Sequence, residues 1–243
     1  MDDSLQLRAT AVHCDVFHSR WPRRVQGGIS PINYDLSVDS LNLAPNISIR
    51  QATMNDLLPL LNVCLQTGNS GADATDHFFD PEILGRVYVA PYLEFSPEFS
   101  FAITAPEPCG YILAALDTKI FEAKLAEDYW PALQARYQFA HPNFKPSDLE
   151  IFFMVHSPEI APDAVSNEFP SHMHIDLLPK IQGKGVGGTA TQMLFEKLIA
   201  AGSSGVHLSV GISNLRAQSF YRKLGFKDLQ NKGDALLMGR AFN

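Results

Sequence analysis

The sequence predicts one α/β domain that begins near residue 46 and continues to the end of the chain. Hydrophobic residues make up 46% of the sequence and charged residues 19%, which is typical of a globular protein. Segments with strand periodicity alternate with segments of helical periodicity, most regularly in roughly the last seventy residues. Residues 1–45 show no such pattern, so we expect them to form a poorly ordered or accessory extension to the domain at 46–243.

The individual elements follow from local patterns in chain order. Ile47–Arg50 alternates apolar and polar residues as a half-buried strand does, and Thr53 is a suitable N-cap for a helix that ends at Gly68. Pro81 suits the first turn of a short helix, and the turn at 106–110 predicts an antiparallel hairpin. Strands are expected at 47–50, 100–104, 111–116, 151–156, 171–178, 205–210 and 235–239. Further helices are expected at 121–133, 185–201 and 214–224, and loops at 68–80, 138–148 and 157–170.

Composition disfavours several classes of function. The formal charge of −7 argues against a nucleic-acid partner, and no stretch has the roughly 18 consecutive apolar residues that span a membrane. The three cysteines form no CxxC pair, so we expect no metal site and a reducing compartment. Acidic Asp2 and Asp3 are unlike the start of a signal peptide. These features predict a cytoplasmic protein, with the nucleus as an alternative.

A glycine-rich turn, Gln182–Gly188, carries the strongest chemical signal. A predicted strand opens through it onto a predicted helix, where free backbone N–H groups and the helix dipole favour an anion such as a diphosphate. Gly183, Gly185 and Gly188 also satisfy the GxGxxG pattern of dinucleotide-binding proteins. Only 55 residues follow Gly188, and no acidic residue ends the next strand, so that interpretation is disfavoured. A flexible glycine loop without a ligand is the remaining alternative.

A second motif spans Asn214–Phe226 (NLRAQSFYRKLGF). Asn214 is a suitable N-cap for the helix that follows. Ala217, Phe220 and Leu224 fall on one helical face, which predicts that Phe220 is a core residue, whereas Tyr221 points elsewhere.

Together the two motifs resemble the signatures of the GNAT N-acetyltransferase superfamily, Gln/Arg-x-x-Gly-x-Gly/Ala and Asn-x-x-Ala-x-x-Phe-Tyr-x-x-x-Gly-Phe. The resemblance implies a central twisted sheet of six to seven strands, mixed and mostly antiparallel, with helices on both faces. It implies that acetyl-CoA is the co-substrate and that a primary amine attacks it directly in a ternary complex. It also implies a coenzyme site formed by Leu177, Leu178, Gln182, Gly183, Lys184, Gly185, Val186, Gly187, Gly188, Asn214 and Tyr221.

The same resemblance gives Tyr221 the role of general acid toward the departing CoA thiolate, since a phenol with an ordinary pKa near 10 keeps its proton at neutral pH. The general base is less clear from sequence. His172, His174 and Asp176 share one face of a strand by two-residue alternation, so His174 or Asp176 could act as the base or serve a structural role. Glu94 lies, with Glu98, in a region where acceptor sites often form.

Residues 79–243 further resemble the acetyltransferase-like C-terminal region of animal O-GlcNAcase and related bacterial proteins. The segments that carry this resemblance are 92–95 (YLEF), 110–117 (GYILAALD), 169–176 (FPSHMHID) and 237–240 (LMGR). The animal region is regarded as a pseudo-acetyltransferase with a degraded CoA motif, whereas Gln182–Gly187 is intact here.

Three functions are therefore weighed: an active N-acetyltransferase, a catalytically silent CoA-binding or interaction module, and, least favoured, a nicotinamide-dependent oxidoreductase. The acceptor stays open between a small amine, an aminoglycoside-like sugar, a polyamine and a protein lysine. The oligomeric state stays open between a monomer and a homodimer.

Overall fold

The computed structural model describes residues 46–242, which form a seven-stranded sheet in the order β1-β2-β3-β4-β5-β7-β6. The extension predicted for residues 1–45 lies outside the described residues. Only β4 and β5 pair in parallel; every other neighbouring pair is antiparallel. The predicted mixed, mostly antiparallel sheet is therefore confirmed. The strands are β1 (Ser48–Gln51), β2 (Ser100–Thr104), β3 (Pro108–Ala115), β4 (Ser171–Leu177), β5 (Gly205–Gly211), β6 (Lys227–Asn231) and β7 (Ala235–Ala241).

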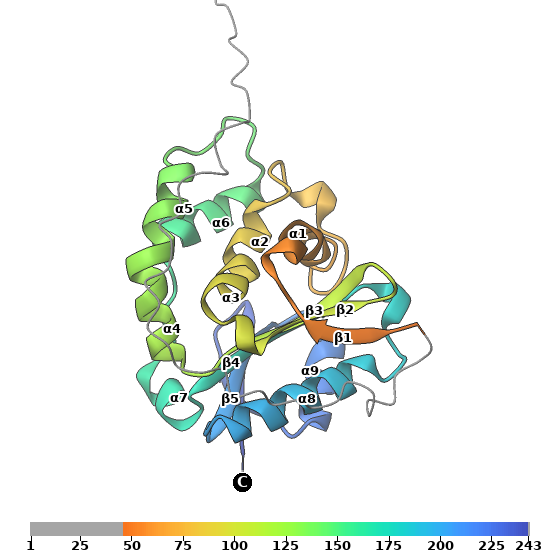
Figure 1. Ribbon diagram of the computed structural model, residues 1–243. Coiled ribbons are helices and arrows are strands. Elements are labelled where there is room, and N and C mark those ends of the chain that lie inside the picture. Colours follow the sequence, from red (N-terminus) through yellow and green to blue (C-terminus); the bar gives the residue numbers. More distant parts are fainter. Residues whose placement is uncertain (1–45, 243) are drawn as a thin grey trace, which may run out of the picture. The chain divides into compact units, whose positions relative to one another are not determined.

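Helices cover both faces of this sheet, with α8 and α9 on one face and α1, α2 and α3 on the other (Figure 1). Side chains alternate along β3 between two cores. Tyr111 and Leu113 enter the core under α1, α2 and α3, and Ile112 and Ala114 enter the core under α8 and α9. The helices are α1 (Leu57–Leu65), α2 (Ile83–Tyr88), α3 (Ala90–Phe95), α4 (Thr118–Lys124), α5 (Trp130–Arg136), α6 (Pro146–His156), α7 (Asp163–Glu168), α8 (Val186–Ala200) and α9 (Leu215–Lys223).

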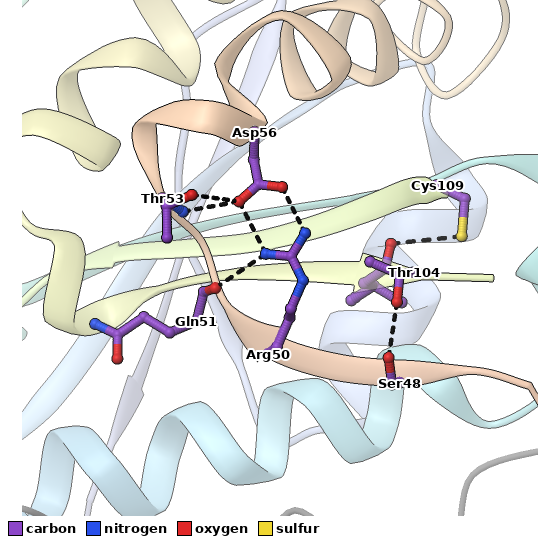
Figure 2. A network of polar contacts seen from close by, with 8 residues as sticks. Ser48, Arg50, Gln51, Thr53, Asp56, Thr104 and Cys109 are labelled. Atoms are coloured by element: carbon purple, nitrogen blue, oxygen red, sulfur yellow. Dashed lines mark hydrogen bonds and ion pairs between the residues drawn. The ribbon is translucent and has the colours of Figure 1, made fainter. Parts of the chain in front are cut away.

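A polar network fixes the connection between β1 and α1 (Figure 2). Asp56 accepts two hydrogen bonds from the Arg50 guanidinium, at 2.8 and 2.5 Å, and a third from the backbone N–H of Thr53 at 2.8 Å. Asp56 is 5% exposed, and the Arg50 hydrogen bond lowers its pKa to about 2. The network therefore holds the first turn before α1 against the edge strand.

The strand expected at 151–156 is wrong, because these residues form the second half of α6. The apolar run Ile151–Val155 fits either structure by composition, but the residues before it start a helix. Pro146 occupies the first turn, and Asp148 accepts a hydrogen bond from the Lys145 N–H at 2.8 Å. Asp148 also accepts the N–H groups of Phe79 and Asp80, at 2.8 and 3.0 Å, so tertiary contacts reinforce the helical start.

Other differences from the expected elements are local. The helix expected over 121–133 is split into α4 and α5 by a π turn at Leu125–Tyr129. The π turn ends just before Pro131, which lies in the first turn of α5 and cannot donate a helical hydrogen bond. The loop expected at 157–170 contains α7, and α3 and β6 were not predicted.

Cys64 and Cys109 are buried and form no disulfide with each other. Burial raises the pKa of the Cys64 thiol to about 12, which is typical of an unreactive packing residue. Cys14 lies outside the described residues.

Candidate active site

The glycine-rich turn forms an open cradle of backbone at the start of α8. Gly183 and Gly185 have φ values of +74° and +79°, which favour glycine. A Cβ added at Gly183, Gly185 or Gly188 would meet no atom within 4 Å. Gly185 is the N-cap and supplies no side-chain cap, so the first N–H groups of the helix are left for an external acceptor. Buried Val186 anchors the helix below the cradle.

Positive charge gathers around this cradle although the whole chain is acidic. Gln182 turns back to donate to the Leu177 carbonyl at 2.7 Å, and its own side-chain oxygen accepts a hydrogen bond from Arg216 at 2.6 Å. Lys184 is exposed within the turn, and Lys180 is exposed two residues before it. The cradle thus combines free amides with three cationic side chains, the chemistry that holds phosphate groups. Arg216, on α9, was not predicted as a site residue.

A gap between β4 and β5 leads away from the cradle. Pairing of the two parallel strands stops after Ser171↔Val206 and His172↔His207, although the strands continue to Leu177 and Gly211. The strands therefore diverge toward their carboxyl ends. A cavity of about 530 Å³ lies there, lined by Asp176, Ile175, Val210, Gly211, Asn214, Tyr221 and residues of the loop after α1.

Leu177 and Leu178, at the end of β4, lie beside this gap. Leu177 pairs with Gly110 of β3, and the Leu178 N–H donates to the Cys109 carbonyl at 2.8 Å. Leu177 also lies close to Gly187, where an added Cβ would be 3.3 Å from its side chain. Gly187 is thus a packing glycine, unlike the open glycines on either side of it.

Tyr221 and Asn214 reach the gap from α9. Asn214 caps the helix, accepting the Ala217 N–H at 3.0 Å. Tyr221 is only 7% exposed, and Phe220 is half-buried, packed against the same core and against Gly187. Phe220 therefore packs inward as predicted, and Tyr221 is buried more deeply than it. The predicted face of Ala217, Phe220 and Leu224 does pack against the core, but the most buried residues of α9 are Gln218 and Tyr221. Burial and the nearby Asp176 raise the pKa of Tyr221 above its usual value, so the phenol keeps its proton at neutral pH.

The face shared by His172, His174 and Asp176 forms the floor of the site. Asp176 accepts a hydrogen bond of 2.5 Å from Tyr111, and burial raises the pKa of Asp176 from 3.8 to about 6. His174 has no hydrogen-bond partner among residues 46–242, and burial lowers its pKa to about 4. The edges of Tyr88 and Tyr92 contact its ring, with centroids 5.9 and 5.2 Å away. Both side chains therefore have altered acidity beside the same gap.

His172 differs, because both of its ring nitrogens are engaged. Nδ1 lies 2.8 Å from the Thr118 hydroxyl, and Nε2 lies 2.7 Å from the Tyr92 hydroxyl. Glu94 and Glu98, the other predicted acidic candidates, line neither this cavity nor a second one of about 310 Å³ that adjoins it on the side of His172. Burial raises the pKa of Glu94, which lies on α3.

Several site residues that sequence reasoning missed come from distant elements: Tyr88, Tyr92, Tyr111, His207 and Arg216. The described part of the chain contains no helix long and apolar enough to cross a bilayer. Among residues 46–242, no group of three or more His, Cys, Asp or Glu side chains is arranged to hold a metal ion.

A twisted sheet whose parallel pair opens beside a glycine-rich helix start defines a recognised class of protein. Residues 81–226 match the model of the acetyltransferase (GNAT) family, and the chain therefore belongs to this family. The chain is similar to the solved structure of SsHAT, with 32% identity and a TM-score of 0.74, over 81% of this chain and 98% of that one. The fold is also like that of PH1933 from Pyrococcus horikoshii OT3, with 16% identity and a TM-score of 0.53, over 81% and 99% of the two chains.

The predicted resemblance to O-GlcNAcase is confirmed. The chain is 27% identical over 168 residues to the proteins named O-GlcNAcase from Rattus norvegicus and Mus musculus. The match covers 66% of this chain but 18% of each relative, so the chain spans less than a fifth of their length.

Proposed function

We propose that the protein is an N-acetyltransferase that moves the acetyl group of acetyl-CoA to a primary amine by direct attack in a ternary complex. The observation that carries the proposal is the combination of an open glycine cradle at the start of α8 with a cavity, lined by Asn214 and Tyr221, where β4 and β5 diverge. Membership of the acetyltransferase family supports acetyl-CoA as the ligand of the cradle and this cavity.

The proposed coenzyme site runs from the pyrophosphate at the cradle to the pantetheine arm along β4. The pyrophosphate would accept hydrogen bonds from the amides of Gln182–Gly188, with Lys184 nearby as a counter-charge. The open space at Gly183, Gly185 and Gly188 suits this role, because a side chain there would occupy the cradle. The pantetheine arm would lie along β4 at Leu177 and Leu178, with Asn214 on the opposite wall.

In the proposed reaction, the amine nitrogen forms a bond to the thioester carbonyl carbon, and the carbon–sulfur bond then breaks. The departing thiolate takes the Tyr221 proton, which burial keeps on the phenol at neutral pH. The proton lost from the amine passes to Asp176 or His174. Asp176 has the better-matched acidity, with a pKa of about 6. His174 has no hydrogen-bond partner within residues 46–242, and it lines a second, adjoining cavity that Asp176 does not.

The intact turn supports activity over a silent role. The resemblance to O-GlcNAcase includes a region regarded as a pseudo-acetyltransferase, in which the coenzyme motif is degraded. Here Gln182, Gly185 and Gly187 are all present, and the cradle they form is open.

Two measurements test the proposal. Calorimetric titration with acetyl-CoA reports binding, and release of free CoA thiol in the presence of a panel of primary amines reports transfer. Tyr221→Phe is expected to bind acetyl-CoA normally and to lower kcat by about a hundredfold, as loss of a general acid does. Tyr129→Phe is the matched control, because Tyr129 is also buried but lines neither cavity.

A Tyr221→Phe variant with the turnover of the wild-type protein would remove Tyr221 from the mechanism. Failure of the wild-type protein to bind acetyl-CoA would remove the coenzyme from the proposal altogether.

A further inference from the structure

A second cavity, of about 310 Å³, adjoins the first one on the face of the sheet that carries His172 and His174. Five residues line both cavities and so mark their junction: Tyr88, Met173, His174, Ser209 and Ala235. If the first cavity holds the thioester end of the coenzyme, the second lies directly beyond it. We infer that this second cavity is the acceptor site and that it takes a compact primary amine on an aromatic or aliphatic stem; the inference rests on the proposed transferase function.

The inner wall of this cavity, here called the aromatic chamber, is apolar. It is formed by Tyr88, Tyr92, Phe121, Leu125, Trp130, Met154 and Leu237. The rings are packed tightly, with Tyr92 stacked on Phe121 at 4.8 Å between centroids. A volume of about 310 Å³ is at the lower end for small-molecule pockets. The chamber therefore suits one small apolar group better than a long polyamine or a peptide backbone.

The mouth of the aromatic chamber is acidic. Glu122, Glu159 and Asp234 line it together with one cation, Lys232, which pairs with Glu159 at 3.3 Å. Among residues 46–242, Glu122 accepts one hydrogen bond, from the Ala161 N–H at 2.9 Å. Burial raises the pKa of this carboxyl, although the charge of Lys119, which pairs with Asp163, acts in the opposite direction. A partly buried carboxylate with no cation in hydrogen-bond contact attracts an ammonium ion, the form in which a primary amine reaches the protein.

The floor of the chamber does not repel such a cation. Burial lowers the pKa values of His172, His174 and His207, so all three imidazoles are neutral at pH 7.

The hydrogen bonds of Thr118 and His172 set the direction in which the Tyr92 hydroxyl donates its proton. Thr118 donates its only hydroxyl proton to the Pro170 carbonyl at 2.7 Å, so it must accept from Nδ1–H of His172.

Nε2 of His172 is then an acceptor, and Tyr92 donates its proton to it at 2.7 Å. The Tyr92 oxygen keeps only lone pairs to offer, which suit the N–H groups of an amine. The chamber thus combines an apolar wall, an acidic mouth and an accepting floor next to His174.

Two pairs of variants test the assignment, with 2-phenylethylamine as the probe. Ala161→Trp would fill the mouth from a loop, and Ala164→Trp makes the same change at an exposed position nearby that does not line the chamber. We expect Ala161→Trp to raise the KM for 2-phenylethylamine at least about tenfold and to leave the Kd for acetyl-CoA unchanged. Ala164→Trp is expected to change neither.

Glu122→Gln removes the charge but keeps an oxygen for the Ala161 N–H, and Glu127→Gln is its control on the exposed side of the same segment. Glu122→Gln is expected to raise KM about threefold to tenfold with little change in kcat, an effect that weakens as salt is added. Glu127→Gln should behave as the wild-type protein.

A wild-type protein that acetylates spermidine or a lysine-containing peptide more efficiently than 2-phenylethylamine would overturn the assignment, as would an unchanged KM in Ala161→Trp. If no amine is acetylated, calorimetric titration of 2-phenylethylamine into the CoA-saturated protein separates the two proposals. Binding that Ala161→Trp abolishes would support the chamber as an amine site while the transferase proposal fails. No binding would overturn the chamber assignment as well.

Discussion

Replacement of Gly185 by alanine separates the role of the glycine turn in folding from its role in binding. Gly185 has a φ of +79°, and an added Cβ would meet no atom within 4 Å. The methyl group therefore causes no clash, and the penalty is the left-handed backbone alone, about 1 kcal/mol. For a domain of this size, that penalty lowers Tm by about 2–4 °C. Gly185→Ala should fold.

Gly202 offers a matched control at the other end of the same helix. Its φ is +91°, and an added Cβ there would also meet nothing within 4 Å. Gly202→Ala should therefore lose the same stability. In Gly185→Ala the methyl group would in addition occupy the proposed pyrophosphate site. We expect its Kd for acetyl-CoA to rise at least about tenfold, which is about 1.4 kcal/mol, whereas Gly202→Ala binds normally.

The assay is calorimetric titration of both variants with acetyl-CoA at a temperature well below both melting points. Thermal melts without ligand compare the Tm values of the two glycine variants, which should be lowered equally because the backbone strain is the same. If the two variants then bind acetyl-CoA with equal Kd, the turn does not hold the pyrophosphate, and the main structural support for the proposed function is lost.

Two further predictions concern ionisation. The pH profile of kcat/KM should show an acid limb, with its midpoint near pH 6 if Asp176 is the base and near pH 4 if His174 is; a flat profile from pH 4 to 8 would exclude both. Asp56→Asn should destabilise the domain by about 1–2 kcal/mol at pH 7, allowing for the half-exposed Arg50 partner. Because the pKa of Asp56 is lowered from 3.8 to about 2, the difference should be complete above pH 4 and disappear as pH falls toward 2. Urea unfolding at several pH values measures it, and a difference that does not change with pH would contradict this reasoning.

The elements that the sequence predicted well are those whose own side chains determine them. α8 and α9 have long helical periods, and β4 alternates along its length. The misassigned segment Ile151–His156 is short and apolar, and its structure is decided outside it, by Pro146 and Asp148. β6 was missed because all five of its residues are exposed, so it has no apolar alternation, and its pairing with β7 creates the strand.

The same distinction applies to the site. The glycine turn and the start of α9 are local motifs, so the sequence alone predicts their residues as candidate site residues. Two-residue alternation also placed His174 and Asp176 on one face correctly. Tyr88, Tyr92 and Tyr111 approach them from α2, α3 and β3, more than sixty residues earlier in the chain, and nothing local marks that approach.

The divergence of β4 from β5 leaves backbone polar groups of these strands without ladder partners beside the proposed coenzyme site. Past His172 and His207, no ladder pair joins these two strands within the described residues, although both lie in the interior of the sheet. Backbone N–H and C=O groups in such a position need partners, which water or a ligand must supply. The pantetheine arm of CoA carries two amides and could pair with β4 there.

A comparison of CoA with adenosine 3′-phosphate 5′-diphosphate, which keeps the diphosphate but lacks pantetheine, tests this directly. Stabilisation by a ligand depends on the ratio of its concentration to its Kd, and any ligand at about 100 times its own Kd stabilises the domain by about 2.7 kcal/mol. The two ligands must therefore be compared at equal concentrations, so that a difference in Kd appears as a difference in Tm. At a concentration that saturates CoA, the shorter ligand should give a clearly smaller rise in Tm, because it leaves the gap between β4 and β5 unfilled. Equal shifts would mean that pantetheine gains nothing from the gap, and the open strands would then need another explanation.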